Sequence, residues 1–202
     1  MKYSKKCIEM IKGFEGCVLH SYKCIDSEEY YTIGYGHYGL TNPNVTIDES
    51  TAENFLIDDM NKCADALDYY VDKYGYNFNQ YQYDALISFI YNLGTGILEQ
   101  LTQAGTRSIY EIGEHMLYYY NSGGVPVDGL IARREAEQKL YLSGIYPDGA
   151  VNNSIDNDPD ELNENSTIND IVDAVIADKF GKGEDRKNAL FELIQKFVNK
   201  RY

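Results

Sequence analysis

Residues 11–37 read IKGFEGCVLHSYKCIDSEEYYTIGYGH, and this stretch decides the fold class that the sequence predicts. At the start of the chain, apolar residues recur at helical spacing, which predicts an amphipathic helix over residues 3–14 that ends near Gly16. Over residues 18–37, strand-forming side chains predominate around a short polar cluster, a composition typical of a β-hairpin. A helix that runs directly into a hairpin places Glu15 at the junction of the two elements.

Helical patterns dominate the chain beyond the hairpin. Ser50 and Glu53 form a capping-box pattern at the start of a long periodic stretch, and Gly123 and Gly124 separate two later stretches. The predicted helices lie at about residues 50–73, 80–93, 107–120 and 129–142. We therefore expect residues 1–146 to form an α+β domain that is mainly helical and carries a small β-hairpin sheet.

Charge is spread unevenly along the 202 residues, whose formal net charge is −14. Residues 147–166 contain six acidic and no basic residues, together with two Pro and five Asn, which predicts a flexible, extended acidic linker. Residues 167–202 have a net charge of +1 and two apolar stripes at helical spacing, which predicts a small all-α helical module. The acidic total argues against nucleic acid as a partner, because phosphate binding needs clustered positive charge.

Targeting, membrane and metal-binding signals are not evident in the sequence. The N-terminal segment lacks an apolar run of signal-peptide length, and nowhere do about 18 apolar residues follow one another. No CxxC pair and no metal-ligand cluster with histidine is formed by the four cysteines, which are Cys7, Cys17, Cys24 and Cys63. We therefore expect a protein made in the cytosol with reduced thiols, without a signal peptide, stable membrane insertion, metal or cofactor.

Glu15 is the first candidate for chemistry, because a carboxyl at a helix terminus can face the hairpin that follows. Burial against apolar neighbours favours the protonated form of a carboxyl, which is the form that a general acid needs. The competing interpretation is a solvated carboxyl at a helix end. Spacing alone does not decide between the two.

Four separate motifs support the catalytic interpretation. They are IKGFEG at residues 11–16, YTIGYGH at 31–37, the matches within 84–94 and the arginine-rich segment 129–137. In this order they resemble the bacteriophage-type lysozymes of glycoside hydrolase family 24, over roughly residues 3–146. The resemblance implies a lysozyme-like fold and hydrolysis of the β-1,4 bond between N-acetylmuramic acid and N-acetylglucosamine in peptidoglycan, without a cofactor.

The resemblance also implies roles for three positions. Glu15 would be the general acid that protonates the leaving glycosidic oxygen. The second catalytic position, nine residues later, falls on Cys24, and the threonine that helps to hold the water corresponds to Thr32. Thr32 lies eight residues after Cys24 instead of the family's six, so either the chain contains a two-residue insertion or Asp26 takes the second position.

Cys24 and Asp26 both remain candidates for the second position. Residues two apart share a face of a strand, so both would point the same way. A carboxylate is the usual base of inverting glycosidases, whereas a thiol, with a reference pKa of about 8.5, is mostly protonated at neutral pH. We prefer Cys24 for its register in the resemblance, although the chemistry favours Asp26. Their non-catalytic alternatives are a buried inert thiol and a turn residue.

Further residues are candidates for substrate binding. Arg133 or Arg134 would pair with Glu15 or with substrate through a forked guanidinium, or else form an exposed ion pair with a glutamate on its own helix. His37 is either a hydrogen-bonded structural residue, which we prefer, or a proton shuttle. Tyr35 is a candidate for contact with a sugar ring, with half-buried packing as the alternative, and Asn92 is a candidate for contact with an N-acetyl group, with a capping or core role as the alternative.

A second resemblance lies at residues 167–200, where KFGKGEDRK at 179–187 is similar to the short cell-wall-binding repeat of some phage lysozymes of Gram-positive hosts. The residues that would grip a muropeptide are Lys179, Phe180, Lys182 and Arg186. Phe180 stands where this repeat usually has Trp, and the stretch before the last helix is several residues short. The alternatives to wall binding are a solvated basic tail and an amphipathic membrane-active end.

Together these observations predict an endolysin with a lysozyme-like catalytic domain at 1–146, an acidic linker at 147–166 and a helical wall-binding module at 167–202. Its partner would be peptidoglycan. Since no signal peptide is recognised, a separate membrane-permeabilising protein would have to give it access to the wall. Two other functions remain open: a lytic transglycosylase, and a peptidoglycan-binding protein without activity.

Overall fold

The computed structural model describes residues 1–122 and 124–147 of the 202-residue chain. The chain divides into two units, residues 1–141 and 142–202. The predicted linker from residue 148 onward and the predicted C-terminal module lie outside the described residues. Within the described part, no helix is long and apolar enough to cross a membrane.

The first helix, α1 (Lys5–Glu15), extends to Glu15 itself. Its N-terminus is capped by Ser4, whose hydroxyl accepts a hydrogen bond from the backbone N–H of Cys7 at 3.2 Å. At its C-terminus stands Gly16, whose φ of 66° lies in a region that residues with side chains avoid. The chain therefore leaves the helical path immediately after Glu15.

A three-stranded antiparallel sheet follows α1. Its strands are β1 (Val18–Tyr22), β2 (Tyr31–Gly34) and β3 (His37–Leu40), in the spatial order β1-β2-β3. Tyr35 and Gly36 form the two-residue turn between β2 and β3, and Gly36 has a φ of 95°. The single hairpin predicted over residues 18–37 is therefore wrong in its extent, because the chain turns at Gly36 and returns as a third strand.

The first strand ends at Tyr22, which pairs with Thr32, and residues 23–30 form a loop. The prediction that Cys24 and Asp26 share a strand face is wrong, because neither lies in a strand. The physical reason is the run of polar residues in this loop, which offers no apolar face that a longer strand could bury.

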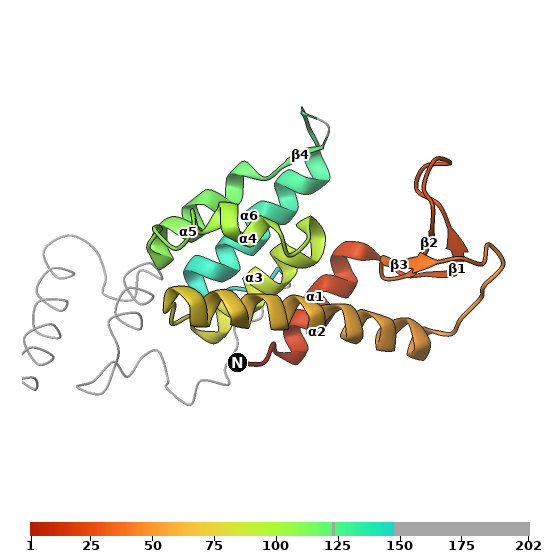
Figure 1. Ribbon diagram of the computed structural model, residues 1–202, viewed down its shortest axis with the longest axis horizontal. Coiled ribbons are helices and arrows are strands. Elements are labelled where there is room, and N and C mark those ends of the chain that lie inside the picture. The colour runs from red at the N-terminus through yellow and green to blue at the C-terminus, as the bar shows by residue number, and fades with distance from the viewer. Residues whose placement is uncertain (123, 148–202) are drawn as a thin grey trace, which may run out of the picture. The chain divides into compact units, whose positions relative to one another are not determined.

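Helices make up most of the rest of the described chain (Figure 1). Their bounds are α2 (Glu49–Tyr74), α3 (Gln80–Leu93), α4 (Ile97–Leu101), α5 (Ile109–His115) and α6 (Asp128–Ser143), with a 3₁₀ turn at Met116–Tyr118. Two short strands, β4 (Asn121–Ser122) and β5 (Val125–Pro126), pair with each other before α6. The helix predicted over 107–120 is thus shorter than expected, and α4 is an additional helix.

The long helices begin at side-chain caps. Asp48 accepts a hydrogen bond from the backbone N–H of Thr51 at 2.8 Å, so α2 starts before the predicted cap. Asn79 and Gln82 bond each other's backbone N–H groups at 2.9 and 3.0 Å, a reciprocal capping box at the start of α3. These local bonds fix where the two helices start.

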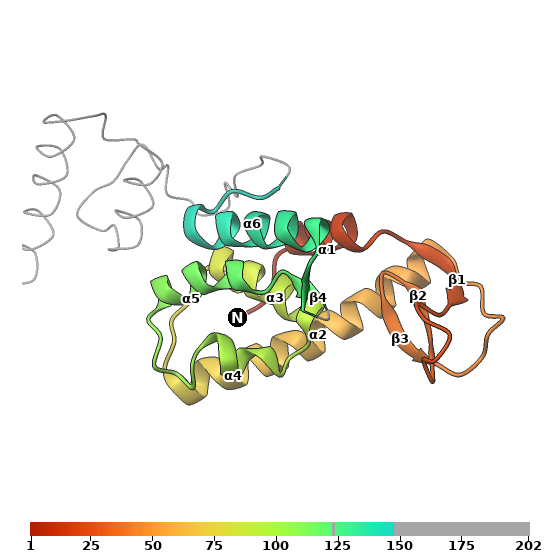
Figure 2. The same ribbon diagram turned by 90° about the horizontal axis from the view of Figure 1, so that it is seen from above.

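The central helix of the helical part is α3. Residues 81–90 are all buried, and α1, α2 and α4 pack against this helix. The 26-residue α2 packs against β2 as well as against α3, so one continuous helix connects the sheet with the helical part (Figures 1 and 2). This shared helix sets the position of the sheet next to the end of α1.

Candidate active site

Glu15 lies where the helical part meets the sheet. It is the last residue of α1, and its side chain is 21% exposed. One carboxyl oxygen, Oε1, is 2.6 Å from Nη1 of Arg133 on α6. Among the described residues, no donor forms a hydrogen bond with the other oxygen, Oε2. Arg133 therefore orients the carboxyl through Oε1, and Oε2 is available to a ligand.

Arg133 is held by three acceptors. Besides Oε1 of Glu15, Oε1 of Glu137 accepts from its Nε at 3.0 Å, and the backbone oxygen of Ser88 accepts from its Nη2 at 3.2 Å. The guanidinium also lies 4.9 Å from the centre of the Phe14 ring, and the side chain is 6% exposed. The predicted pairing of Arg133 with Glu15 is confirmed. The alternative, an ion pair with a glutamate on the same helix, also forms with Glu137, but it is buried and not exposed as expected.

Glu137 and Arg134 form a fully buried ion pair on α6. Nε of Arg134 lies 2.9 Å from Oε2 of Glu137, although without hydrogen-bond geometry. Oε1 of Glu137 accepts hydrogen bonds from the Ser88 hydroxyl at 2.7 Å and from Nη2 of Arg134 at 3.2 Å. Burial raises the pKa of Glu137 against the opposing effect of the arginines, and burial lowers the pKa of Arg134. Each charge in this group therefore depends on the others for compensation.

Arg134 also reaches Asn92, near the end of α3. Its Nη2 donates to Oδ1 of Asn92 at 3.0 Å. A guanidinium only donates, so this contact leaves the amide N–H₂ of the half-buried Asn92 as a donor for a ligand carbonyl. The prediction that Arg134 touches substrate does not fit the structure, because its side chain has no exposed surface. Its contacts instead orient Asn92.

The turn between β2 and β3 lies against Glu15. A Cβ added at Gly36 would be 3.7 Å from Oε2 of Glu15, and one added at Gly34 would be 3.1 Å from Cβ of Ala52 on α2. Tyr35, between these glycines, is half-buried, with Nζ of Lys12 5.7 Å from the centre of its ring. The predicted sugar contact Tyr35 therefore belongs to the turn that approaches Glu15.

Tyr91 on α3 is a residue that the sequence reasoning missed. Its hydroxyl donates to the backbone oxygen of Tyr35 at 2.8 Å, across 56 positions of sequence. A backbone acceptor carries no residue-type signal, so no sequence pattern could have indicated this contact.

Tyr22 connects Glu15 with the loop at 23–30. Burial raises the pKa of the Tyr22 phenol, and the neighbouring Cys24, Glu15 and Glu28 raise it further. Its partner across the sheet, Thr32, is 6% exposed. The structure thus places Cys24 and, through strand pairing, Thr32 next to Tyr22, and Glu15 is near enough for its charge to raise the pKa of the phenol.

The loop itself is open to solvent. Cys24 and Asp26 are both exposed, and the backbone N–H of Cys24 donates to Oε2 of Glu28 at 2.9 Å. The non-catalytic alternative of a buried thiol is wrong for Cys24. Glu28 belongs to the polar run at 26–29, which predicts only a turn. In the structure its carboxylate, like that of Asp26, lies in the same loop as Cys24.

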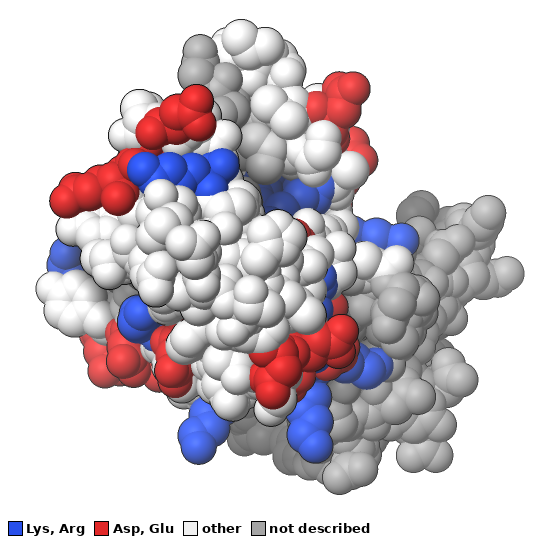
Figure 3. Space-filling view, turned by 90° about the vertical axis from the view of Figure 1, so that its right-hand side faces the viewer, with Lys and Arg blue, Asp and Glu red and all other residues white. Residues whose placement is uncertain are grey.

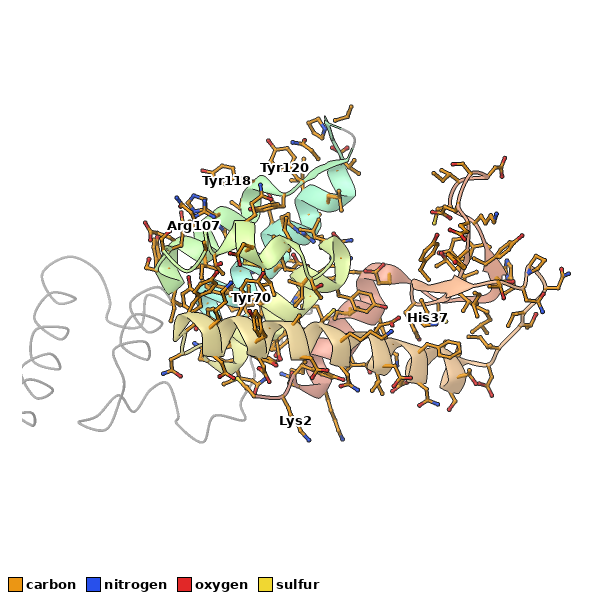
Figure 4. The ribbon with its side chains drawn as sticks, in the orientation of Figure 1. Lys2, His37, Tyr70, Arg107, Tyr118 and Tyr120 are labelled. Atoms are coloured by element: carbon orange, nitrogen blue, oxygen red, sulfur yellow. The ribbon has the colours of Figure 1, made fainter. Side chains whose placement is uncertain are left out.

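His37 packs onto α2. Its Nδ1 lies 2.7 Å from Oδ2 of Asp59, and its ring stacks on Phe55 with the ring centres 4.5 Å apart. Figure 4 shows the side chain between the sheet and α2. The expected hydrogen bond of His37 is confirmed, and its acceptor lies on α2.

The face that carries the sheet has charges of both signs side by side (Figure 3). Among the ion pairs of the described residues, Lys12 of α1 lies 2.8 Å from Glu53 of α2, and Lys62 lies 2.7 Å from Asp59 within α2. No group of His, Cys, Asp and Glu that could hold a metal ion occurs among the described residues.

The residues predicted to grip a muropeptide lie outside the described part of the chain; they are Lys179, Phe180, Lys182 and Arg186.

Comparison with known families gives one match. Residues 12–137 match the family model described as phage lysozyme. An endolysin of Bacillus phage B103 is 38% identical over 148 residues, which cover 71% of this chain and 55% of that protein. The chain thus spans little more than half the length of the Bacillus phage relatives that it matches.

Solved structures agree with the fold. An endolysin of Escherichia coli O157:H7 phage FAHEc1 superposes with a TM-score of 0.60 at 29% identity, over 73% of this chain and 97% of that one. The muramidase domain of SpmX from Asticaccaulis excentricus gives a TM-score of 0.60 at 27% identity, over 70% of this chain and 97% of that domain. The predicted α+β lysozyme-like fold is confirmed for the described residues.

Proposed function

This chain belongs to the phage lysozyme family, and from that membership we propose that it is an endolysin of the glycoside hydrolase family 24 type. It hydrolyses the β-1,4 bond between N-acetylmuramic acid and N-acetylglucosamine in peptidoglycan and thereby lyses the host cell. Endolysins of other phages that are similar to this chain support the proposal.

The observation that carries the proposal is the state of the Glu15 carboxyl. Arg133 holds Oε1 at 2.6 Å, while Oε2 has no hydrogen-bond partner among the described residues. A carboxyl fixed in this way can present one oxygen to the glycosidic oxygen and transfer its proton as the bond to the sugar C1 breaks. Arg133 keeps the carboxyl in place during this transfer, and its own position depends on Glu137 and Ser88.

Water must then add to C1 from the other side of the sugar. Cys24 and Thr32 are the groups proposed to hold this water, and their common neighbour Tyr22 supports the assignment. Asp26 remains the alternative, since a carboxylate is the stronger base. Both candidates lie in the exposed loop, where a substrate could order them.

Two side chains are proposed to bind the sugar. The Asn92 amide N–H₂ has the chemistry to donate to an N-acetyl carbonyl, because Arg134 occupies the Asn92 oxygen. Tyr35 offers an aromatic ring on the turn beside Glu15.

Digestion of purified sacculi by the wild type and by Glu15→Gln tests this function. We expect the wild type to release fragments whose masses show added water, and the variant to clear no walls although it remains folded at the assay temperature. Anhydro products would indicate a lytic transglycosylase instead. Binding of sacculi without release of fragments would indicate a non-catalytic wall-binding protein.

The residues beyond the described part are proposed to serve delivery. An acidic linker at 147–166 would tether a wall-binding repeat at 167–202, and a membrane-permeabilising partner would give the protein made in the cytosol access to the wall. Tethering raises the local concentration of the catalytic part only when both parts engage the same wall. Deletion of residues 167–202 should therefore weaken pull-down by isolated walls and leave turnover of soluble fragments unchanged; an unaffected pull-down would contradict wall binding.

A further inference from the structure

We propose that Tyr91 is a positioning residue for Glu15, which it influences through the Tyr35–Gly36 turn. The proposal rests on the proposed function, because it takes Glu15 to be the catalytic acid. Tyr91 lies in the last turn of α3, and its hydroxyl donates to the backbone oxygen of Tyr35 at 2.8 Å. One bond therefore ties the central helix to the turn between β2 and β3.

The turn borders the oxygen of Glu15 that is free to react. A Cβ at Gly36 would lie 3.7 Å from Oε2, whereas Arg133 occupies the other oxygen. A displacement of the turn by an ångström would change both the space and the hydration at Oε2. Misplacement on this scale is enough to slow a reaction strongly, because proton transfer depends on the distance between the reacting atoms.

Other contacts hold the neighbourhood of the turn at different points. Gly34 fits closely onto Ala52 of α2, which fixes the end of β2. Nζ of Lys12 lies over the Tyr35 ring, and this contact restrains the Tyr35 side chain. Tyr91 bonds the backbone carbonyl of the turn itself, so it restrains the peptide group that leads into Gly36.

The Tyr91 phenol is a permanent donor. Burial raises its pKa, and the charges of Asp59, Glu15 and Cys63 raise it further, against an opposing effect of Arg133. The hydroxyl therefore stays protonated throughout the neutral range, and the bond to Tyr35 does not depend on pH there.

Tyr91→Phe removes the hydroxyl and keeps the ring, and Tyr83→Phe is its matched control. Tyr83 lies on the same helix, and its hydroxyl donates to Oδ1 of Asp68 at 2.8 Å, away from the turn. Each substitution deletes one tyrosine hydrogen bond of the same length. Steady-state kinetics on a soluble peptidoglycan tetrasaccharide, with products identified by mass, separates an effect on the acid from an effect on folding.

For Tyr91→Phe we expect kcat to fall roughly 5- to 20-fold, with KM changed less than about twofold, because the turn affects the transition state more than ground-state binding. Tyr83→Phe should keep kcat within about twofold of wild type, while both variants lower Tm by a similar few degrees. Equal kcat values for the two variants would overturn the proposal. A wild type that releases no product would overturn the proposed function, and this role with it.

Discussion

The two sides of the Glu15 carboxyl differ in how they are built. On the side of α3 and α6, Arg133, Arg134 and Glu137 are almost fully buried and share their hydrogen bonds. On the side of the sheet, Cys24 lies exposed in a loop, held through a backbone N–H by Glu28. The helical part thus fixes the carboxyl of Glu15, the proposed acid, whereas Cys24, the group proposed to hold water, is held only from an exposed loop.

This difference separates stability from activity. Changes on the buried side leave charges without partners and should cost folding free energy as well as rate. Changes in the loop should alter rate alone.

Glu137→Gln should have the largest effect on stability. It removes the one negative charge that is fully buried with Arg134 and bonded to Arg133, so we expect a loss of about 3–5 kcal/mol in the free energy of unfolding. Urea denaturation measures this loss. Glu135→Gln is the matched control, because Glu135 is exposed on the same helix, and its change should stay within about 0.5 kcal/mol. Similar losses in both variants would contradict the buried network.

Cys24→Ala and Asp26→Ala should separate the two candidates for the second catalytic position. We expect Cys24→Ala to lower kcat on sacculi about 100-fold and Asp26→Ala to lower it less than twofold, since Cys24 is the one that neighbours Tyr22. Both variants should unfold within about 0.5 kcal/mol of wild type, because both residues are exposed in a loop. The reverse order of activities would assign the role to Asp26, and full activity in both would exclude the loop pair.

His37→Gln should have the smallest effect on rate. It breaks the contact with Asp59 and the stacking on Phe55, so we expect the free energy of unfolding to fall by about 1 kcal/mol. Turnover should stay within twofold, because the contacts that His37 makes are with Asp59 and Phe55 on α2. Lys62 is the other partner of Asp59, and its side chain is 70% exposed. Lys62→Met should therefore lower the free energy of unfolding by less than about 0.5 kcal/mol. A tenfold loss of turnover in His37→Gln would restore the proton-shuttle interpretation.

The sequence predicts best what short-range chemistry determines. The end of α1 near Gly16 follows from residues that lie next to each other, because a glycine after a helix acts locally. Helix α2 starts earlier than predicted because Asp48, and not Ser50, is its N-cap residue. The length of β1 is overestimated, since Cys24 and its neighbours have no partner strand.

Contacts across long stretches of chain could not be derived from spacing. Arg133 and Glu15 are 118 positions apart, and the sequence left their pairing as one of two alternatives. The sequence did not indicate the hydrogen bond of Tyr91, because its acceptor is a backbone oxygen. The burial of Arg134 was missed for a related reason: an arginine-rich helix looks exposed unless its buried glutamate partner is known.

The distance in sequence between Glu15 and Arg133 has a consequence during synthesis. The chain is made from its N-terminus, so α1 and the sheet emerge from the ribosome long before α6. Until residue 133 has emerged, the Glu15 carboxyl lacks the arginine that orients it. A chain truncated before residue 133 therefore lacks the contact that orients the Glu15 carboxyl, and the proposed lytic activity would come late in translation.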